Sequence, residues 1–381
     1  MKTRLVFMKL CENQSQQNRA CSMHRLLLSG YDTIECAYYL AFGHGCLLDI
    51  EQLAAEKEAL RQLKIRKQKP IRLGNEEFLL APHGTASGYP FLIENEAFSI
   101  QFGEFNKPSF FVTFRSVALW HHGIQSLHQR FLDWAQSIGL SSYEPERLSR
   151  VDFTFDYFLP DIDFDEDSFV SAASKDNQHR KNRKIQTFSF GEGEIKLRIY
   201  NKCDEITEKS SKSWFFKLWG AEQDVWRIEW QVRKGSLRSC GIQTFTDLHQ
   251  RQGRLLQLLV NEHTTLRIKE DDSNRSRWAL HPLWQDLTEQ VAKIEILEGL
   301  DTLNELDMNA LLEERKMRIA ISVYGYLKRM AAIQCLQHGK DKISVTEAQA
   351  LLSMVVRHVH NPLSWPLDVE ERVTEMRLGK W

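Results

Sequence analysis

The segment RVDFTFD (Arg150–Asp156) alternates strictly between polar and apolar side chains. Its apolar row is Val151, Phe153 and Phe155, and its polar row is Arg150, Asp152, Thr154 and Asp156. Successive side chains of a β-strand point to opposite faces of a sheet. The segment therefore predicts a strand with one face in a core and a second face rich in charge.

Two later segments repeat this pattern. IKLRIYNK (Ile195–Lys202) places Lys196, Arg198, Tyr200 and Lys202 opposite an apolar row, and VWRIEWQVR (Val225–Arg233) places Arg227, Glu229, Gln231 and Arg233 opposite another. If the three strands lie in one sheet, their apolar rows build its core. The other face then gathers three carboxylates, several guanidinium groups and one tyrosine.

Such a face suits metal-assisted attack on a phosphodiester. Asp152, Asp156 and Glu229 offer the oxygen ligands that hard divalent cations take in proteins. A bound cation would polarise the scissile phosphate. Tyr200 would then be the nucleophile that forms a covalent phosphotyrosine intermediate.

A tyrosine nucleophile needs nearby positive charge, because a phenol is mostly protonated at neutral pH. Arg198 and Lys202 stand two residues to either side of Tyr200 on the same face, so we expect them to favour the phenolate. The competing interpretation is an ordinary solvated sheet face. In that case Tyr200 is an edge residue, and the aspartates pair with Arg150 or Arg227.

The rest of the first 240 residues predicts a mixed fold. Strands are expected at 77–80, 89–93, 98–102, 110–114 and 186–190, with helices at 50–68 and 124–138. A strand at Leu26–Leu28 is expected to lead through Gly30 into a helix. This order favours an α+β fold with an antiparallel sheet over a doubly wound parallel fold.

After about residue 243 the pattern turns helical, over 244–260, 283–298, 308–335 and 345–358. The apolar residues of the third helix favour packing in a helical core, with a module for DNA or a partner as the alternative. We expect three parts: a flexible leader over residues 1–23, a sheet domain over 24–290, and a helical C-terminal region over 291–381.

At the three patterned strands the chain resembles the Rep-trans family of replication initiation factors, which includes rolling-circle plasmid initiators, relaxases of integrative elements and phage initiators. SRVDFTFDY (149–157), LRIYNKCDEI (197–206) and VWRIEWQVR (225–233) are similar to its R-x-D-x-x-x-D, R-[IL]-Y-[ND]-K-x-x-E and W-R-x-E motifs, in the same order. HGTASGYPFLI (83–93) and PSFFVTFRSVALW (108–120) also resemble its N-terminal half. The resemblance covers roughly residues 24–285.

The resemblance implies a nicking domain akin to the HUH endonucleases but without their histidine pair. Tyr200 matches the motif tyrosine, and the basic motif positions expected to contact the phosphate are Arg198, Lys202 and Arg227. The acidic positions implied to hold Mg²⁺ or Mn²⁺ are Asp152, Asp156 and Glu229, with Glu205 as a further candidate.

The implied activity is sequence-specific, metal-dependent nicking and rejoining of one DNA strand through a 5′-phosphotyrosyl intermediate. It would initiate rolling-circle replication, or conjugative transfer, of a plasmid, phage or other mobile element. The implied partners are the element's own origin DNA, supercoiled or single-stranded at the nick, a host helicase, and a second copy of the chain. The alternative is a non-catalytic origin-binding protein with the same fold.

The formal net charge is −1, so DNA would have to meet local basic patches rather than a uniformly basic surface. Arg61–Arg72 and His179–Lys184 are two such segments, with an ordinary solvated surface as the alternative for each. The seven cysteines show no CxxC spacing, which favours reduced thiols in a cytoplasmic protein over a zinc ribbon or disulfides. No apolar run reaches the length of a membrane span.

Two further motifs are set aside. His358-Val359-His360 reads like the metal pair of HUH enzymes, but it ends a helical pattern, so we interpret these residues as surface histidines at a helix end. The sequence contains no P-loop, which argues against a built-in helicase or NTPase.

Overall fold

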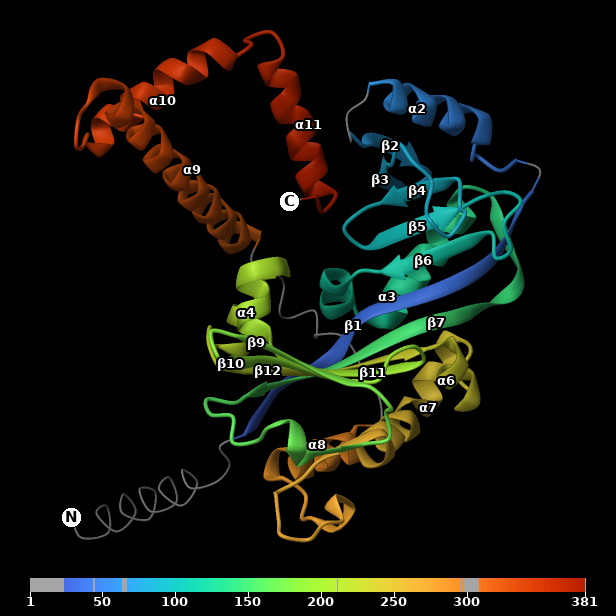
Figure 1. The fold of residues 1–381 in the computed structure, drawn as a ribbon. Coiled ribbons are helices and arrows are strands. Elements are labelled where there is room, and N and C mark those ends of the chain that lie inside the picture. Colours follow the sequence, from blue (N-terminus) through green and yellow to red (C-terminus); the bar gives the residue numbers. More distant parts are fainter. Residues whose placement is uncertain are drawn as a thin grey trace, which may run out of the picture.

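The computed structural model describes residues 24–43, 45–63, 67–210, 212–294, 297 and 308–380. The expected leader at residues 1–23 lies outside this range. The described chain is an α+β structure with one large sheet, helices packed on it, and three helices toward the C-terminus (Figure 1). This confirms the predicted α+β class, whereas the kinship to HUH endonucleases stays a prediction.

The large sheet has 11 strands. They are β1 (Arg25–Phe42), β2 (Lys69–Leu73), β3 (Glu76–Leu80), β4 (Phe91–Glu94), β5 (Phe98–Phe102), β6 (Phe110–Phe114), β7 (Leu140–Phe158), β9 (Asp176–Lys181), β10 (Lys184–Phe190), β11 (Ile195–Asn201) and β12 (Val225–Arg233). Their order is β2-β3-β4-β5-β6-β1-β7-β12-β11-β10-β9, and neighbours are antiparallel. A separate pair joins β8 (Phe169–Ser171) to β13 (Thr264–Leu266).

Two long strands hold the sheet together. β1 has 18 residues and β7 has 19, and they pair with each other along most of their length. The strands β2–β6 continue the sheet on the β1 side, and β9–β12 continue it on the β7 side (Figure 1). Both halves of the sheet are therefore built on one central pair of strands.

The apolar rows of the three patterned strands are buried, as predicted. Val151, Phe153, Phe155, Leu197, Ile199, Ile228 and Trp230 are all inaccessible to solvent. Helices α7 (Phe245–Leu258) and α8 (Pro282–Lys293) cover this face (Figure 1). Trp230 of β12 meets Trp284 of α8 edge to face, with ring centres 5.8 Å apart, a geometry that aromatic pairs favour.

Helix α3 (Ser116–Ser137) is interrupted at Gly123, whose φ of 72° is left-handed. Beyond this break, Phe131 and Trp134 pack among the phenylalanines of β3–β6. Before it, Trp120 joins a second apolar cluster with Phe215 and Trp219 of α5 (Trp214–Trp219). Because of this break, one helix packs into two apolar clusters.

Helix α2 (Ile50–Gln62) lies beside β2 and β3, in the half of the sheet that consists of β2–β6.

Two predictions about the first part of the chain are wrong. Gly30 does not lead into a helix, because β1 continues through it to Phe42. The predicted helix over 50–68 ends at Gln62, and Lys69–Leu73 forms strand β2. The basic segment Arg61–Arg72 is therefore divided between a helix end and an edge strand. Residues 64–66 lie outside the described chain.

The C-terminal helices are α9 (Met308–His338), α10 (Val345–Val359) and α11 (Trp365–Arg377), and the sequence missed the last of them. α11 is tied to the first half of the sheet by ion pairs Lys67–Glu371 and Arg377–Glu77. Apolar side chains of α9 are exposed in several directions, including Met317, Ile319, Ile321, Val323 and Leu336. The expected helical core around α9 is therefore not present in the described chain. The division into domains stays a prediction.

The short helices α4 (Lys202–Glu205) and α6 (Lys234–Ser239) follow β11 and β12. Among the described residues, no helix combines the length and apolar character needed to cross a membrane.

Replacing Gly30 tests how closely α3 is packed on β1. An added Cβ would lie 2.8 Å from the Trp120 ring, so we expect Gly30→Ala to lower the free energy of unfolding by about 1–3 kcal/mol, as overpacking does. The control is Gly325→Ala in α9, where nothing lies within 4 Å and about 0.5–1 kcal/mol should be gained. Urea unfolding of both variants makes the comparison, and similar changes in both would contradict it.

Candidate active site

The three patterned strands are neighbours in the order β7-β12-β11, as the sequence predicted. Asp156, Arg227 and Tyr200 face one another as one cross-strand row. The next row along the strands consists of Thr154, Glu229 and Arg198. Residues paired directly across a sheet share a face, so the predicted tyrosine, arginines and carboxylates lie together on one side. We call this side the polar face.

Tyr200 is held by Glu229. The hydroxyl of Tyr200 donates a hydrogen bond to Glu229 Oε2 over 2.9 Å, and Arg198 forms an ion pair with Glu229 Oε1. The Lys202 ammonium lies 5.5 Å from the centre of the Tyr200 ring, and the Arg198 guanidinium lies 5.8 Å from it. Three of the four predicted catalytic residues are therefore in one group: Arg198 and Lys202 lie near the Tyr200 ring, and Tyr200 and Arg198 both contact the Glu229 carboxylate.

The surroundings of Tyr200 keep its hydroxyl protonated. Burial raises the pKa of Tyr200 well above its ordinary value, and the Glu229 charge raises it further, against the opposing charges of Arg227 and Arg198. Arg198 thus favours the phenolate, as predicted of a flanking cation, but burial and the Glu229 charge outweigh it. Attack by Tyr200 would require a proton acceptor, and Glu229 is within hydrogen-bond distance.

Arg227 is fully buried and lies between two carboxylates. It donates to Asp156 from Nε over 2.6 Å and from Nη2 over 2.8 Å, and to Asp32 from Nη1 over 2.7 Å. The Phe215 ring lies 4.6 Å from its guanidinium carbon, and the Trp219 indole N–H donates to Asp156. This enclosed geometry fixes Arg227 in position and leaves it little room to reach a phosphate directly.

Asp32 was missed by the sequence analysis. It lies where the β1–β7 register shifts between Tyr31 and Thr33, and it accepts hydrogen bonds from Ser116 and Lys212 as well as from Arg227. Although burial raises it, the charges of Lys212, Arg227 and Lys202 hold the pKa of Asp32 well below its usual range. The wrong helix prediction after Gly30 hid a carboxylate that belongs to the polar face.

Lys202 is buried and pairs with Glu205 over 2.6 Å. Burial lowers the pKa of Lys202, and the nearby Arg227 charge lowers it further. Glu205 thus lies beside the polar face, bonded to a lysine. Its role as a metal ligand stays a prediction.

Asp152 sits one row further along β7. Arg150 donates to its two oxygens over 2.8 and 2.5 Å and also contacts Glu35 over 3.3 Å. Burial raises the pKa of Asp152 to about 7, even though Arg150 lowers it.

The metal set implied by the resemblance does not come together in this arrangement. Each of its carboxylates is bonded to an arginine: Asp152 to Arg150, Asp156 to Arg227, and Glu229 to Arg198. Within the described residues, their oxygens form no group of three close enough to share one ion. Their donor chemistry suits a hard cation, but in this arrangement the arginines occupy the same oxygens.

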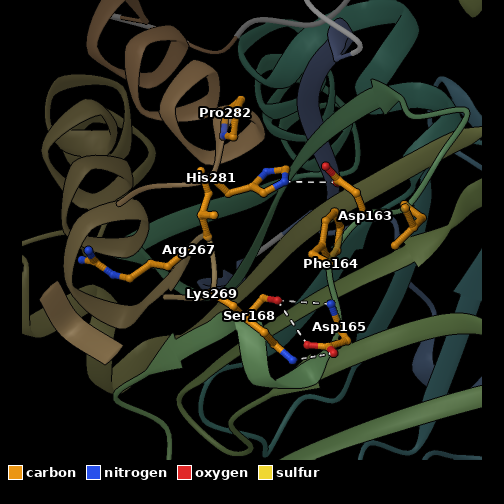
Figure 2. A pocket seen from close by; sticks show the side chains of 10 residues that line it. Asp163, Phe164, Asp165, Ser168, Arg267, Lys269, His281 and Pro282 are labelled. Atoms are coloured by element: carbon orange, nitrogen blue, oxygen red, sulfur yellow. Dashed lines mark hydrogen bonds and ion pairs between the residues drawn. The ribbon is translucent and has the colours of Figure 1, made fainter. Parts of the chain in front are cut away.

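A different trio could hold a metal ion. Ligand atoms of His24, Asp163 and His281 all lie within 4.8 Å of one another, and the two histidines are buried. Asp163 and His281 also line a pocket of about 660 Å³ together with Phe164, Ser168, Arg267 and Lys269 (Figure 2). His281 begins α8, on the side of the sheet opposite the polar face.

The hydrogen bonds of His281 work against a metal there. Its Nδ1 accepts the Leu283 amide over 3.2 Å, so in the neutral ring Nε2 carries the proton, 3.1 Å from Asp163 Oδ1. An ion at Nε2 would displace this proton and leave the Leu283 amide facing a protonated Nδ1. Asp163 and His281 are thus joined by a hydrogen bond, whereas His24 only meets the His281 ring edge to face, with ring centres 5.4 Å apart, and its buried Nε2 has no hydrogen-bond partner among the described residues.

His358 and His360 lie where the sequence interpretation placed them. Both are exposed, His358 is in the last turn of α10, and its Nδ1 lies 2.9 Å from the Met354 carbonyl oxygen.

No family model and no curated protein matches the chain. Among solved structures, it is similar to a rolling circle replication initiator protein from Geobacillus stearothermophilus, with a TM-score of 0.43 and 16% identity. The match covers 71% of this chain and 99% of that chain. At this similarity, the function of the chain has to be inferred from its own site, and membership of the Rep-trans family stays a prediction.

Asp152 should give the folded protein a distinctive pH dependence. Its pKa is about 7 when folded against an ordinary 3.8, so the folded state binds the proton more tightly. The resulting stability is complete below the ordinary pKa and is lost as the pH rises through about 7. Relative to Asp152→Asn, the wild-type free energy of unfolding should fall between those pH values by up to about 1.4 kcal/mol per pH unit.

Urea unfolding at pH 5, 6, 7 and 8 measures this difference. Asp161→Asn, at an exposed position just after β7, is the control and should keep the wild-type pH dependence. Parallel curves for wild type and Asp152→Asn would show that Asp152 is ionised throughout.

Proposed function

We propose that this protein nicks and rejoins one strand of DNA, with Tyr200 as the nucleophile, to initiate rolling-circle replication or transfer of a mobile element. The observation that carries the proposal is the 2.9 Å hydrogen bond from the Tyr200 hydroxyl to Glu229, on a face that also presents Arg198. A nucleophile bonded to a base, and next to a cation, is the arrangement that covalent catalysis requires.

The proposed chemistry assigns one task to each of these groups. The Tyr200 oxygen attacks the phosphorus while Glu229 accepts the phenolic proton, and the bond from phosphorus to the 3′ oxygen breaks. The products are a 5′-phosphotyrosyl bond and a 3′ hydroxyl, whose proton comes from solvent. Arg198, half-exposed beside Tyr200, would stabilise the charge that builds up on the phosphate.

The buried cations have a supporting task in this proposal. Arg227 and Lys202 lie behind Tyr200 and contribute positive charge without direct contact to the substrate. The requirement for Mg²⁺ or Mn²⁺ stays a prediction of the resemblance, as do the host helicase and a second copy of the chain as partners.

A covalent-adduct assay tests the nucleophile. Wild type, Tyr200→Phe and the control Tyr143→Phe, an exposed tyrosine, are incubated with supercoiled DNA of the cognate element and Mg²⁺, Mn²⁺ or a chelator. We expect relaxed circles and a protein–DNA adduct with wild type and the control, and neither with Tyr200→Phe. Cutting that survives in Tyr200→Phe would assign the nucleophile to another residue.

Glu229→Gln tests the proton acceptor. The amide keeps the size of the side chain but cannot accept the phenolic proton, so we expect the single-turnover nicking rate to fall by about 10²–10⁴-fold. DNA affinity should stay within about twofold, and circular dichroism should confirm the fold, since Arg198 loses its ion pair. A wild-type nicking rate in this variant would remove Glu229 from the mechanism.

One observation favours the non-catalytic alternative. The acidic groups of the polar face are all engaged in ion pairs, and the Tyr200 hydroxyl remains protonated. A face of this kind could serve structure alone while the protein only binds its origin. Specific DNA binding by the wild type, without nicking under any of the metal conditions above, would support that function instead.

A further inference from the structure

The basic segment His179–Lys184 lies at the turn of a β-hairpin. β9 and β10 are joined by Asn182 and Arg183, both with positive φ, as in the tight turns that match the twist of a hairpin. The hairpin forms the outer edge of the large sheet, next to β11. Its strands therefore extend the polar face beyond Tyr200.

The strand register decides which hairpin residues share that face. Thr187 pairs with Tyr200 on one side and with His179 on the other. Ser189 likewise links Arg198 to Asn177. The Tyr200 row thus continues outward across two more strands.

The alternation of side chains along β9 also decides on which face of the sheet each basic residue of the hairpin lies. Lys181 and Lys184 pair with each other, and Lys181 lies on the His179 side because it is two residues further along β9. Its ion pair confirms this side, since Glu208 follows α4 beside the polar face. Arg180 lies on the opposite face, where it pairs with Glu166 over 3.7 Å.

The polar face therefore divides into two parts that differ in how their charged groups are paired. Toward β7 and β1 it holds the buried carboxylates Asp152, Asp156 and Glu229 and the partly buried Asp32, each paired with an arginine or a lysine. On β9, β10 and β11 it presents hydroxyl, amide and basic side chains, and the register places no carboxylate of these three strands there. Tyr200 lies at the boundary. The outer residues Asn177, His179, Lys181 and Lys184 are exposed.

We propose that the outer polar face of β9 and β10 is the track along which single-stranded DNA reaches Tyr200. This inference rests on the proposed function and names the surface that positions its substrate. Lys181, Lys184 and His179 contact the phosphates, because they are the exposed basic side chains of this part of the face. The occupant is a single strand because the Tyr200 hydroxyl is bonded to a buried carboxylate, so the backbone must descend to the sheet surface.

The test is the salt dependence of binding to a fluorescent oligonucleotide that contains the cognate nick site. It uses Lys181→Gln/Lys184→Gln in the full-length chain, with Tyr200→Phe present so that no cleavage interferes. Each lost phosphate contact on a single strand should reduce the slope of log affinity against log salt by about 0.7, so the double variant should lose about 1.4. Arg180→Gln, in the same hairpin but on the other face, should keep the slope.

Glu208→Gln provides a second arm. It releases Lys181 from its ion pair, so the affinity should rise or stay the same. Three results would contradict the proposed DNA track. They are an unchanged slope in the double variant, an equal change of slope in Arg180→Gln, and equal affinity for duplex and single-stranded DNA.

Nicking is measured separately, with chains that retain Tyr200. A changed slope without any nicking would retain the track and reject the proposed catalysis. Nicking with an unchanged slope would reject the track alone.

Discussion

The polar face depends on one fully buried charge, the guanidinium of Arg227. Removing a charge from water costs several kcal/mol, and the cost is offset only when the partners are well placed. Here the partners are Asp156, on the neighbouring strand, and Asp32, at a register shift in β1. Three strands must therefore hold their positions together, and the aromatic rings of Trp120 and Phe215 close the site above them.

This constraint separates the polar face into a rigid inner part and a more accessible outer part. The inner carboxylates are saturated by arginines and serve mainly to fix the geometry, as pairing with Arg150 and Arg227 indicates. Glu229 differs, because it shares its two oxygens between Arg198 and the hydroxyl of Tyr200. Arg198 is also half-exposed, whereas Arg227 is sealed. The proposed reacting groups, Tyr200 and Glu229, thus lie at the accessible edge of a network of buried ion pairs.

The sequence predicted most of the residues that lie on the polar face, but fewer of the ion pairs and hydrogen bonds between them. Strict alternation in Arg150–Asp156 and Val225–Arg233 gave the right strands, because burial on one face imposes a period of two. The carboxylate Asp32 escaped, because a register shift follows no sequence period and the Gly30 region was read as a helix. The competing interpretation named Arg150 and Arg227 as partners of the aspartates, and the structure confirms both ion pairs. Which arginine meets which aspartate, and the pairing of Glu229 with Arg198, depend on the register between strands and could not be chosen from the sequence.

The order of strands has a consequence for how the protein is made. β12 lies between β7 and β11 in the sheet, although it follows both in the sequence. Until Val225–Arg233 has left the ribosome, β11 has no place beside β7, and the hairpin of β9 and β10 has no sheet to join. Tyr200 is thus translated before Glu229, its hydrogen-bond partner, can lie next to it. A nascent or truncated chain that ends before β12 carries the proposed nucleophile without Glu229, its proposed proton acceptor.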